Sequence, residues 1–251
     1  DVAMELGIPT LEIAHGTNRE NTYHKQLAYA DHLAVYSDII AAQSREQGND
    51  RVIGIGKPGV YEDVSMEERK YPVVVISFVS STEQEIFSYA CNLAARLAHE
   101  QCLVVYKAHI TELKNDTQMQ QIAQELGNMQ IVGGEVDIRE IAAISDIVVG
   151  IQSSAIYDVL PWPMLKVIAV KNKAKNVSET RTDDVLEEVA ANGDLVMVAD
   201  EEQLYREVAG YQRGTRYRGD VNSFWPKDAK ERFLALVERY LQENDNDTRR
   251  S

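Results

Sequence analysis

The sequence has little cysteine and no long apolar run. Its two cysteines, Cys91 and Cys102, are too few for a disulfide framework and lack the spacing of a zinc site, as is typical of a reducing compartment. No stretch reaches the roughly 18 consecutive apolar residues that a membrane-spanning helix requires. We therefore expect neither a disulfide framework nor a transmembrane helix.

Positive charge is also in short supply. Lys and Arg together number 26 and Asp and Glu number 40, which gives a formal net charge of −14 at pH 7. A surface that binds nucleic acid neutralises many phosphates with cations, so we expect no nucleic-acid partner. The same acidity predicts weak binding to anionic lipid, unless a local basic patch such as Arg213 to Arg218 overrides it.

Apolar runs of strand length alternate with segments of helical period along nearly all of the 251 residues. This alternation predicts an α/β fold in which Rossmann-like parallel sheets carry helices on both faces. In the first part we expect strands at residues 8–14, 33–36 and 52–55, and helices at residues 23–30 and 38–47. Gly, Pro and charged residues without an apolar period predict a linker at residues 57–71.

A second series follows the linker and is long enough for a domain of its own, residues 72–215. We expect strands at residues 73–78, 103–107, 129–132, 147–150, 167–170 and 195–198, helices at 83–98, 118–126, 138–144 and 201–209, and one helix opening at Ser154. A helical extension at 216–242 and a disordered polar tail at 243–251 follow. Because no start signal precedes the first strand, we expect residues 1–56 to be the carboxyl part of an amino-terminal domain whose first residues are missing.

Ligands of open α/β sheets bind at the carboxyl ends of strands, so polar residues just beyond a strand are site candidates. His15, Gly16 and Thr17 follow the first strand, where the glycine lets a ligand approach the backbone and the histidine titrates near neutrality. One interpretation is that His15 is a catalytic base or that the segment makes an oxyanion contact. The other is that His15 only ends the strand and is hydrogen-bonded into a turn. The sequence leaves both interpretations open.

Lys107 and His109 follow the second strand of the second series. Alternate positions of an extended segment face the same side, so both side chains can reach one pyrophosphate. The alternative is a solvated exit from the strand.

A third candidate group follows the very apolar strand at residues 147–150. Ser153 or Ser154 caps the next helix, where hydroxyl groups, backbone N–H groups and the helix dipole favour a phosphate. Asp158 lies one turn deeper on the same face as Ser154, where it can accept from a ribose hydroxyl. An ordinary serine cap without a ligand is the alternative.

The loop before the helix at residues 138–144 contains Gly133, Gly134 and Glu135. Its glycines allow the backbone to pass close beside a planar base. Asp137 is expected to be the N-cap of the helix that follows.

Two segments resemble a phosphate-binding P-loop and a metal-binding motif, but neither has the residues that such a site requires. The segment Gly54-Ile-Gly-Lys-Pro58 lacks the first glycine of a P-loop and has proline where Ser or Thr would bind magnesium. Asp245 and Asp247 lie in the polar tail with no strand before them, and no His and acidic cluster has metal-ligand spacing. We therefore expect no metal.

Taken together, the motifs resemble those of GT-B fold glycosyltransferases, in particular bacterial capsule polysaccharide transferases, polysialyltransferases and teichoic acid polymerases. The resemblance covers about residues 8–170. It rests on the order and spacing of four blocks, which are His15-Gly-Thr17, Lys57-Pro-Gly59, Lys107-x-His109, and the block from Ser145-Asp146 through Ser153-Ser154 to Tyr157-Asp158.

Two positions depart from this pattern. His109 is followed by Ile110 rather than Pro, and Gly150-Ile-Gln152 replaces the Thr-Asp-Tyr that precedes the serines in the teichoic acid enzymes. The second departure argues against glycerophosphate transfer and for sugar transfer.

The resemblance implies two Rossmann-like domains, one on the acceptor side and one that holds the nucleotide of an activated sugar. It places His15, with Gly16 and Thr17, on the block that supplies the base or a phosphate contact, His109 on the histidine of a His-Pro block, and Ser153 with Ser154 on the serines that grip the donor phosphate. Lys107, Glu135, Gln152 and Asp158 complete the expected donor site.

The leading hypothesis is a metal-independent glycosyltransferase of bacterial surface polysaccharide synthesis, with a CMP- or UDP-linked donor and no further cofactor. The acceptor is expected to be a glycan or lipid-linked glycan, and the protein to be cytoplasmic, with any association with the inner membrane peripheral. Two alternatives stay open. One is a nucleotide-sugar 2-epimerase, which needs no acceptor, and the other is a non-catalytic nucleotide-binding or scaffold domain of a larger glycosyltransferase.

Overall fold

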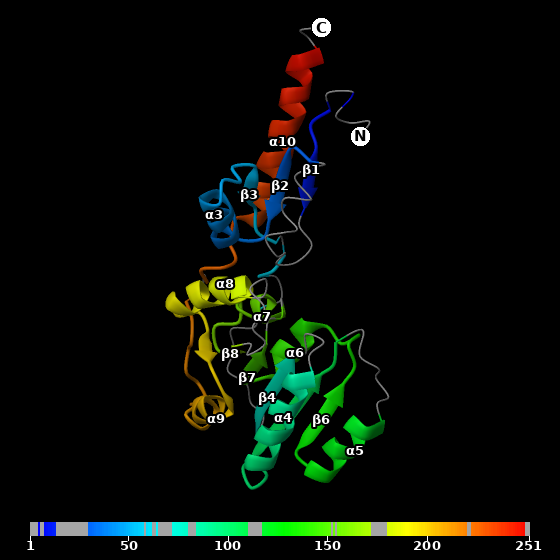
Figure 1. The fold of residues 1–251 in the computed structure, drawn as a ribbon, viewed down its shortest axis with the longest axis vertical. Helices are drawn as coiled ribbons and strands as arrows, with labels where there is room; N and C mark the ends of the chain where they lie inside the picture. Colours follow the sequence, from blue (N-terminus) through cyan, green and yellow to red (C-terminus); the bar gives the residue numbers. More distant parts are fainter. Residues whose placement is uncertain are drawn as a thin grey trace. The chain divides into compact units, whose positions relative to one another are not determined.

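The computed structural model describes residues 5, 8–13, 30–57, 59–61, 64, 72–79, 84–109, 117–151, 153, 155–171, 180–219 and 222–248 (Figure 1). Contacts divide the chain into two compact units. Unit 1 comprises Asp1–Glu62, Val177–Val185 and Val221–Ser251, and unit 2 comprises Asp63–Asn176 and Leu186–Asp220. Most of the expected carboxyl-terminal extension therefore groups with unit 1.

Unit 1 contains a three-stranded parallel sheet in the order β1-β2-β3 (Figure 1). The strands are β1 (Leu11–Ile13), β2 (His32–Val35) and β3 (Val52–Gly54), and the helix α3 (Asp38–Glu46) connects β2 to β3. Helix α3 begins after Ser37, whose hydroxyl accepts a 3.2 Å hydrogen bond from the amide of Ile39. The helix expected at 23–30 lies outside the described residues, except for Ala30.

The last helix, α10 (Ala229–Thr248), packs on the unit 1 sheet. Leu236 is buried together with Ala34 of β2 and Ile55, which follows β3. The guanidinium of Arg232 donates to both carboxylate oxygens of Asp38, each at 2.8 Å. An apolar contact and an ion pair thus hold α10 to the elements around β2 and β3.

Helix α10 is longer than predicted. Residues 243–248, which we expected to be disordered, are helical. The segment from Ala229 to Thr248 contains neither glycine nor proline, so no residue in it terminates the helix, and its Asn and Asp residues lower helix propensity only modestly.

Unit 2 contains a six-stranded parallel sheet in the order β6-β5-β4-β7-β8-β9. The strands are β4 (Val74–Val79), β5 (Cys102–Lys107), β6 (Met129–Val132), β7 (Ile147–Gly150), β8 (Lys166–Val170) and β9 (Val196–Val198). Counted from β4, this is the 3-2-1-4-5-6 order of a doubly wound dinucleotide-binding fold, in which the strand order reverses between β4 and β7. The predicted α/β class with parallel sheets is confirmed.

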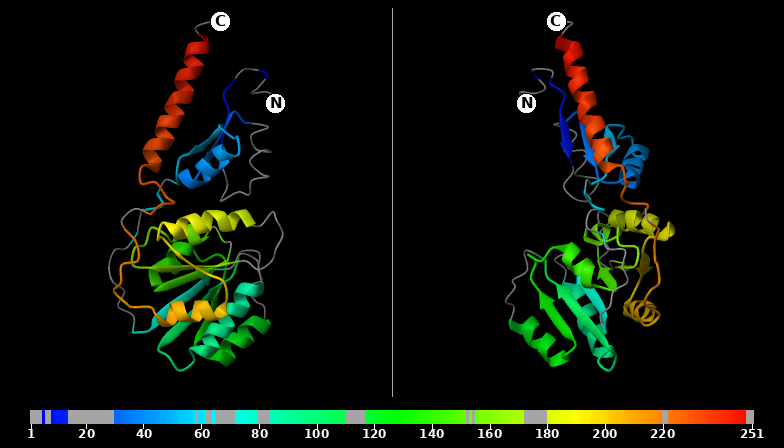
Figure 2. Two further views of the ribbon diagram at one scale, coloured as in Figure 1. Left: turned by 60° about the vertical axis from the view of Figure 1, so that its left-hand side comes forward. Right: turned by 180° about the vertical axis from the view of Figure 1, so that it is seen from behind.

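The helices of unit 2 lie on both faces of its sheet (Figure 2). They are α4 (Gln84–Arg96), α5 (Thr117–Leu126), α6 (Ile138–Ile144), α7 (Ala155–Asp158) and α9 (Glu201–Ala209), and α8 (Thr180–Ala191) spans the boundary between the units. Helix α4 contacts α5 and α9 on one face, and α6 contacts α7 on the other. The sequence predicts no helix between β8 and β9, yet α8 lies there with Leu186 and Val189 buried.

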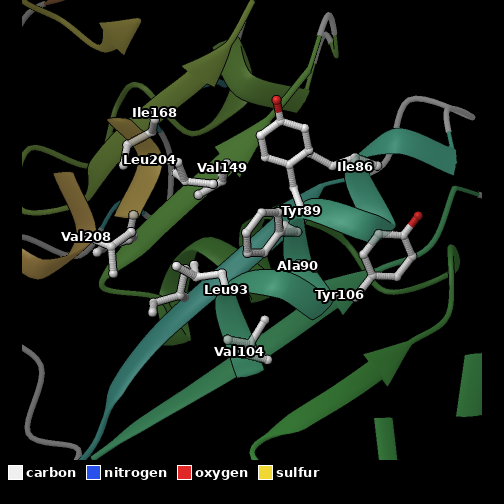
Figure 3. Packing of buried hydrophobic residues seen from close by; sticks show 14 of the residues in the cluster. Ile86, Tyr89, Ala90, Leu93, Val104, Tyr106, Val149, Ile168, Leu204 and Val208 are labelled. Atoms are coloured by element: carbon white, nitrogen blue, oxygen red, sulfur yellow. The ribbon is translucent and has the colours of Figure 1, made fainter. Parts of the chain in front are cut away.

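One apolar cluster joins α4, α5 and α9 to the sheet. Alternate strand residues point into it, among them Val104 and Tyr106 of β5 and Val149 of β7 (Figure 3). From α4 they meet Ile86, Ala90 and Leu93, which are spaced four and three residues apart and so share one side of the helix. This cluster fixes the strands whose carboxyl ends carry the candidate site.

Candidate functional site

The carboxyl ends of the unit 2 strands lie level with one another. Val79 at the end of β4 pairs with both Lys107 of β5 and Gly150 of β7, and Lys107 pairs with Val132 of β6. The loops that follow these four strands therefore start at the same edge of the sheet. Because the strand order reverses between β4 and β7, this edge is where a doubly wound sheet binds its ligand.

Gly150 allows the chain to turn tightly at the end of β7. A Cβ atom at this position would lie 2.8 Å from Cγ1 of Ile156 and 2.8 Å from Cγ2 of Val79. Both distances are too short for any side chain, so only glycine lets α7 pack directly over the strand ends. Ile156 is fully buried there and holds α7 beside the site.

Ser153 forms the entry to α7, as predicted. Its hydroxyl accepts a 3.3 Å hydrogen bond from the amide of Ala155, and its carbonyl accepts a 3.0 Å bond from the amide of Ile156. Helix α7 has only four residues, so its dipole is that of a single turn and adds little to phosphate binding. Asp158 is the last residue of this turn and is half-buried, whereas Gln152 and Ser154 lie outside the described residues.

Lys107 connects the end of β5 to the neighbouring loop. Its ammonium group donates a 3.3 Å hydrogen bond to the carbonyl oxygen of Gly134. The next residue, Ala108, is buried, and its amide continues the ladder to the carbonyl of Val132 at 3.0 Å. His109 follows in a half-buried position, so Lys107 and His109 flank a buried residue as the alternation predicts.

The loop between β6 and α6 folds tightly on itself. The carboxylate of Glu135 turns back on Gly133, since a Cβ atom built there would lie 2.1 Å from Oε2 of Glu135. The amide of Val136 donates to the carbonyl of Gly133 at 3.2 Å, which closes the turn. The side chain of Asp137 accepts a 2.7 Å bond from the amide of Arg139, so the predicted N-cap of α6 is confirmed.

The candidate base and the loop after β4 belong to segments outside the described residues. His15, Gly16 and Thr17 lie outside the described residues, so their roles stay predictions. The segment from Ser80 to Glu83 also lies outside them, but it follows β4 at the reversal of strand order. Its polar residues, Ser80 to Glu83, come directly after an apolar strand, and this pattern marks the segment as a further candidate that was not among the predicted site residues.

Ser145 and Asp146, which open one block of the family resemblance, lie at the amino end of β7, away from the candidate site. The hydroxyl of Ser145 donates to the carbonyl of Ile141 at 2.6 Å. The buried carboxylate of Asp146 accepts from the amide of Val75 at 2.8 Å and from the hydroxyl of Tyr211 at 2.9 Å. The block therefore combines a structural part before the strand with candidate site residues after it.

The basic segment from Arg213 to Arg218 combines one buried arginine, Arg218, with two exposed ones, Arg213 and Arg216. Arg218 is buried, which lowers its pKa to about 10, and its guanidinium donates to the carbonyl oxygens of Leu160, Trp162, Leu165 and Asp194. Arg213 donates to Asp146 at 3.3 Å, and Nε of Arg216 donates to the carbonyl of Arg218 at 3.0 Å. These hydrogen bonds hold loops of unit 2 together, and binding of the segment to anionic lipid stays a prediction.

Within the described residues, no group of three or more His, Cys, Asp or Glu side chains is arranged to hold a metal ion. None of the helices in the same ranges has the length and apolar character needed to cross a membrane.

Comparison with solved structures places this architecture among known folds. A candidate UDP-N-acetylglucosamine 2-epimerase from Listeria monocytogenes matches 96% of this chain and 70% of its own, at 14% identity and a TM-score of 0.58. MurG from Acinetobacter baumannii matches 82% of this chain at 11% identity and a TM-score of 0.53, and a glycosyltransferase from Rickettsia africae matches 79% at 16% identity and a TM-score of 0.50. The fold is that of the GT-B glycosyltransferases.

The GT-B fold agrees with the resemblance drawn from the sequence motifs. The chain spans 59% of the length of MurG and of the Rickettsia enzyme. No protein-family model matches the chain, and the comparison with curated proteins finds no match either.

Proposed function

We propose that the chain belongs to a glycosyltransferase that moves a sugar from a CMP- or UDP-linked donor to a growing bacterial surface polysaccharide in the cytoplasm. The acceptor is a glycan or lipid-linked glycan. The observation that supports this proposal is that the loops after β5, β6 and β7 start at one edge of the GT-B-type sheet beside the reversal of strand order. Each loop carries groups suited to a different part of a nucleotide sugar.

The donor phosphates would lie at the β5 and β7 loops. Lys107 and His109 supply positive charge or N–H donors, and the hydroxyls of Ser153 and Ser154, with the side chain of Gln152, supply hydrogen bonds. These groups balance the charge that develops on the leaving phosphate, so the reaction needs no metal ion. The carboxylate of Asp158 accepts hydrogen bonds from the ribose hydroxyls.

Transfer of the sugar forms one bond and breaks another. The oxygen of the acceptor hydroxyl attacks the anomeric carbon, and the bond from that carbon to the phosphate oxygen breaks, leaving its electron pair on the phosphate. His15 takes the proton of the acceptor hydroxyl, a role that suits an imidazole titrating near neutrality. Gly16 and Thr17 keep the backbone beside this histidine open to the substrate.

Calorimetric titration of the full chain with CMP, CDP, UDP and GDP tests the donor site. One nucleotide should bind most tightly, and His109→Ala and Ser154→Ala should each weaken that binding at least about tenfold, the loss of one charge-assisted hydrogen bond. His99→Ala is the matched control, because His99 is exposed in the loop before β5, at the opposite edge of the sheet. If both site variants bind as the wild type does, the donor site is misplaced.

A nucleotide-sugar 2-epimerase is the second candidate, favoured by the similarity to the Listeria structure. An epimerase turns over its donor with no acceptor present, whereas a transferase requires one. Incubation of the full chain with a nucleotide sugar, with and without a glycan acceptor, separates the two. Epimerised donor in the absence of acceptor would favour the epimerase, and sugar incorporation into the glycan would favour the transferase.

A further inference from the structure

The carboxyl edge of the unit 1 sheet carries side chains that the donor site does not use. Ala34 of β2 pairs with both Ile13 of β1 and Ile53 of β3, so the three strands end level with one another. Strand β1 ends two residues before His15 in the sequence, and Lys57 follows β3 at the same edge. Because ligands of open α/β sheets bind at this edge, Lys57 lies where unit 1 would hold a ligand of its own.

The backbone before Lys57 is held against the start of α10. Gly56 has a φ of +79°, in the left-handed region that favours glycine. A Cβ atom built at this position would lie 2.6 Å from Cβ of Ala229 and 2.7 Å from Cγ of Pro226. Only glycine allows this close packing, which fixes the place of Lys57 relative to the segment that precedes α10.

Two aromatic rings position two lysine side chains in unit 1. Nζ of Lys57 lies 6.0 Å from the centroid of the Trp225 ring, and Nζ of Lys227 lies 5.9 Å from the centroid of the Tyr61 ring. The hydroxyl of Tyr61 donates a 2.7 Å hydrogen bond to the carbonyl oxygen of Trp225, so both rings belong to one cluster. An aromatic ring attracts an ammonium group but has no net charge, so it positions the cation without neutralising it.

The two carboxylates beside this cluster are bound by one arginine. Nη1 of Arg232 donates to both oxygens of Asp38, and Nε donates to Asp228, each at 2.8 Å. With Lys57 and Lys227, these five side chains carry three positive charges and two negative ones. In a chain with a net charge of −14, such a local excess of positive charge draws an anion to one place.

We propose that Lys57 and Lys227 bind a negatively charged group, a carboxylate or a phosphate, of the acceptor. Ammonium groups donate charge-assisted hydrogen bonds to the oxygens of either group. The charge would come from an acidic sugar or from the phosphate that joins a glycan to its lipid. Naming the ligand as the acceptor rests on the proposed function, whereas the anion site itself does not.

Calorimetric titration of the full chain, with the donor site occupied by a saturating concentration of the nucleotide that binds most tightly, tests this site. Hyaluronan tetrasaccharide supplies carboxylates, geranyl diphosphate supplies the phosphates of a lipid carrier, and chitotetraose is an uncharged glycan. At least one anionic probe should bind about tenfold or more tightly than chitotetraose, as one charge-assisted hydrogen bond allows. Whichever anionic probe binds more tightly identifies the source of the charge.

Substitutions at the two lysines test their part in this binding. Lys57→Gln and Lys227→Gln should each weaken binding of the anionic probe about tenfold, and Lys57→Arg should retain most of it because the charge stays. Lys227 is exposed, so its variant tests the site even if Lys57→Gln lowers stability. Lys230→Gln is the matched control, because it removes the same charge from an exposed position in the first turn of α10 and should leave binding unchanged.

Several results would overturn the assignment. Equal binding of chitotetraose and the anionic probes would refute a charged acceptor. Unchanged binding in both lysine variants, or equal weakening by Lys230→Gln, would refute these two lysines as the site. If no anionic probe binds although a nucleotide does, this inference fails and the proposed donor site stands. If an anionic probe binds through the two lysines but no nucleotide binds, the anion site stands and the proposed function fails.

Discussion

The ammonium group of Lys107 donates a 3.3 Å hydrogen bond to the carbonyl oxygen of Gly134. This bond joins the end of β5 to the loop after β6, so one side chain both carries a positive charge and positions the neighbouring loop. The two roles make Lys107 the residue whose replacement should affect the site most.

Lys107→Met keeps the length of the side chain and removes its charge and its hydrogen bond. Nucleotide binding should weaken more than tenfold, and its dependence on salt should decrease, because one cation no longer contacts the phosphates. Calorimetry at two salt concentrations measures both effects. Lys171→Met is the matched control, since Lys171 also follows a strand of this sheet but pairs with Glu187 at 2.7 Å. If Lys107→Met and Lys171→Met weaken nucleotide binding equally, the effect comes from the net charge of the protein and Lys107 does not contact the phosphates.

Gly150→Ala tests the tight turn at the end of β7. The added methyl group would overlap Ile156 and Val79, and overpacking of this kind costs about 1 to 3 kcal/mol of unfolding free energy. Urea unfolding measures the loss. In the Ile156→Ala background the same substitution should cost less, because the overlapping atoms of Ile156 are gone and only the overlap with Val79 remains. Additive losses would show that the space beside Gly150 is not what requires a glycine.

Asp146→Asn tests whether Asp146 stabilises the fold of unit 2 without taking part in nucleotide binding. The carboxylate holds the amide of Val75, the hydroxyl of Tyr211 and the guanidinium of Arg213, so its replacement should cost about 2 to 4 kcal/mol. Nucleotide affinity, measured well below the unfolding midpoint, should not change, because Asp146 precedes β7. A loss of affinity with unchanged stability would contradict this division.

Stability should fall in acid partly through Asp31. The amide of Thr10 at 2.7 Å, and then its hydroxyl at 2.9 Å, hold the pKa of Asp31 below its ordinary value. A lowered pKa in the folded state contributes stability that is present above about pH 4 and is lost as the pH falls through the folded value. Asp31→Asn should therefore lower the urea midpoint at pH 7 and make a smaller difference at pH 3. An equal difference at both pH values would contradict this linkage.

The sequence predicts the strands of unit 2 well because each is a continuous apolar run between turn residues. It fails for α8, where few apolar residues, chiefly Leu186 and Val189, mark the buried side. The end of α10 is also predicted too early. Polar residues indicate that a segment is exposed to solvent, but they do not by themselves terminate a helix.

The candidate site is predicted less completely than the fold. Strand ends locate Lys107 and Ser153, and the cap at Asp137 follows from local preference. The need for glycine at position 150 and the folding of Glu135 over Gly133 depend on contacts between loops, which no local pattern encodes. Asp146 is part of a recognisable block, yet only the structure shows that its carboxylate binds the amide of Val75, the hydroxyl of Tyr211 and the guanidinium of Arg213.

Amide hydrogen exchange of the full chain, with and without a saturating concentration of the nucleotide that binds most tightly, tests most directly whether the nucleotide binds where we place it. Added protection should appear in the loops after β5, β6 and β7, at residues 107–109, 133–137 and 151–155, and not around Asp146 and Tyr211 at the opposite edge. Protection confined to that opposite edge or to unit 1, or no protection with any nucleotide, would contradict the donor site proposed for this protein.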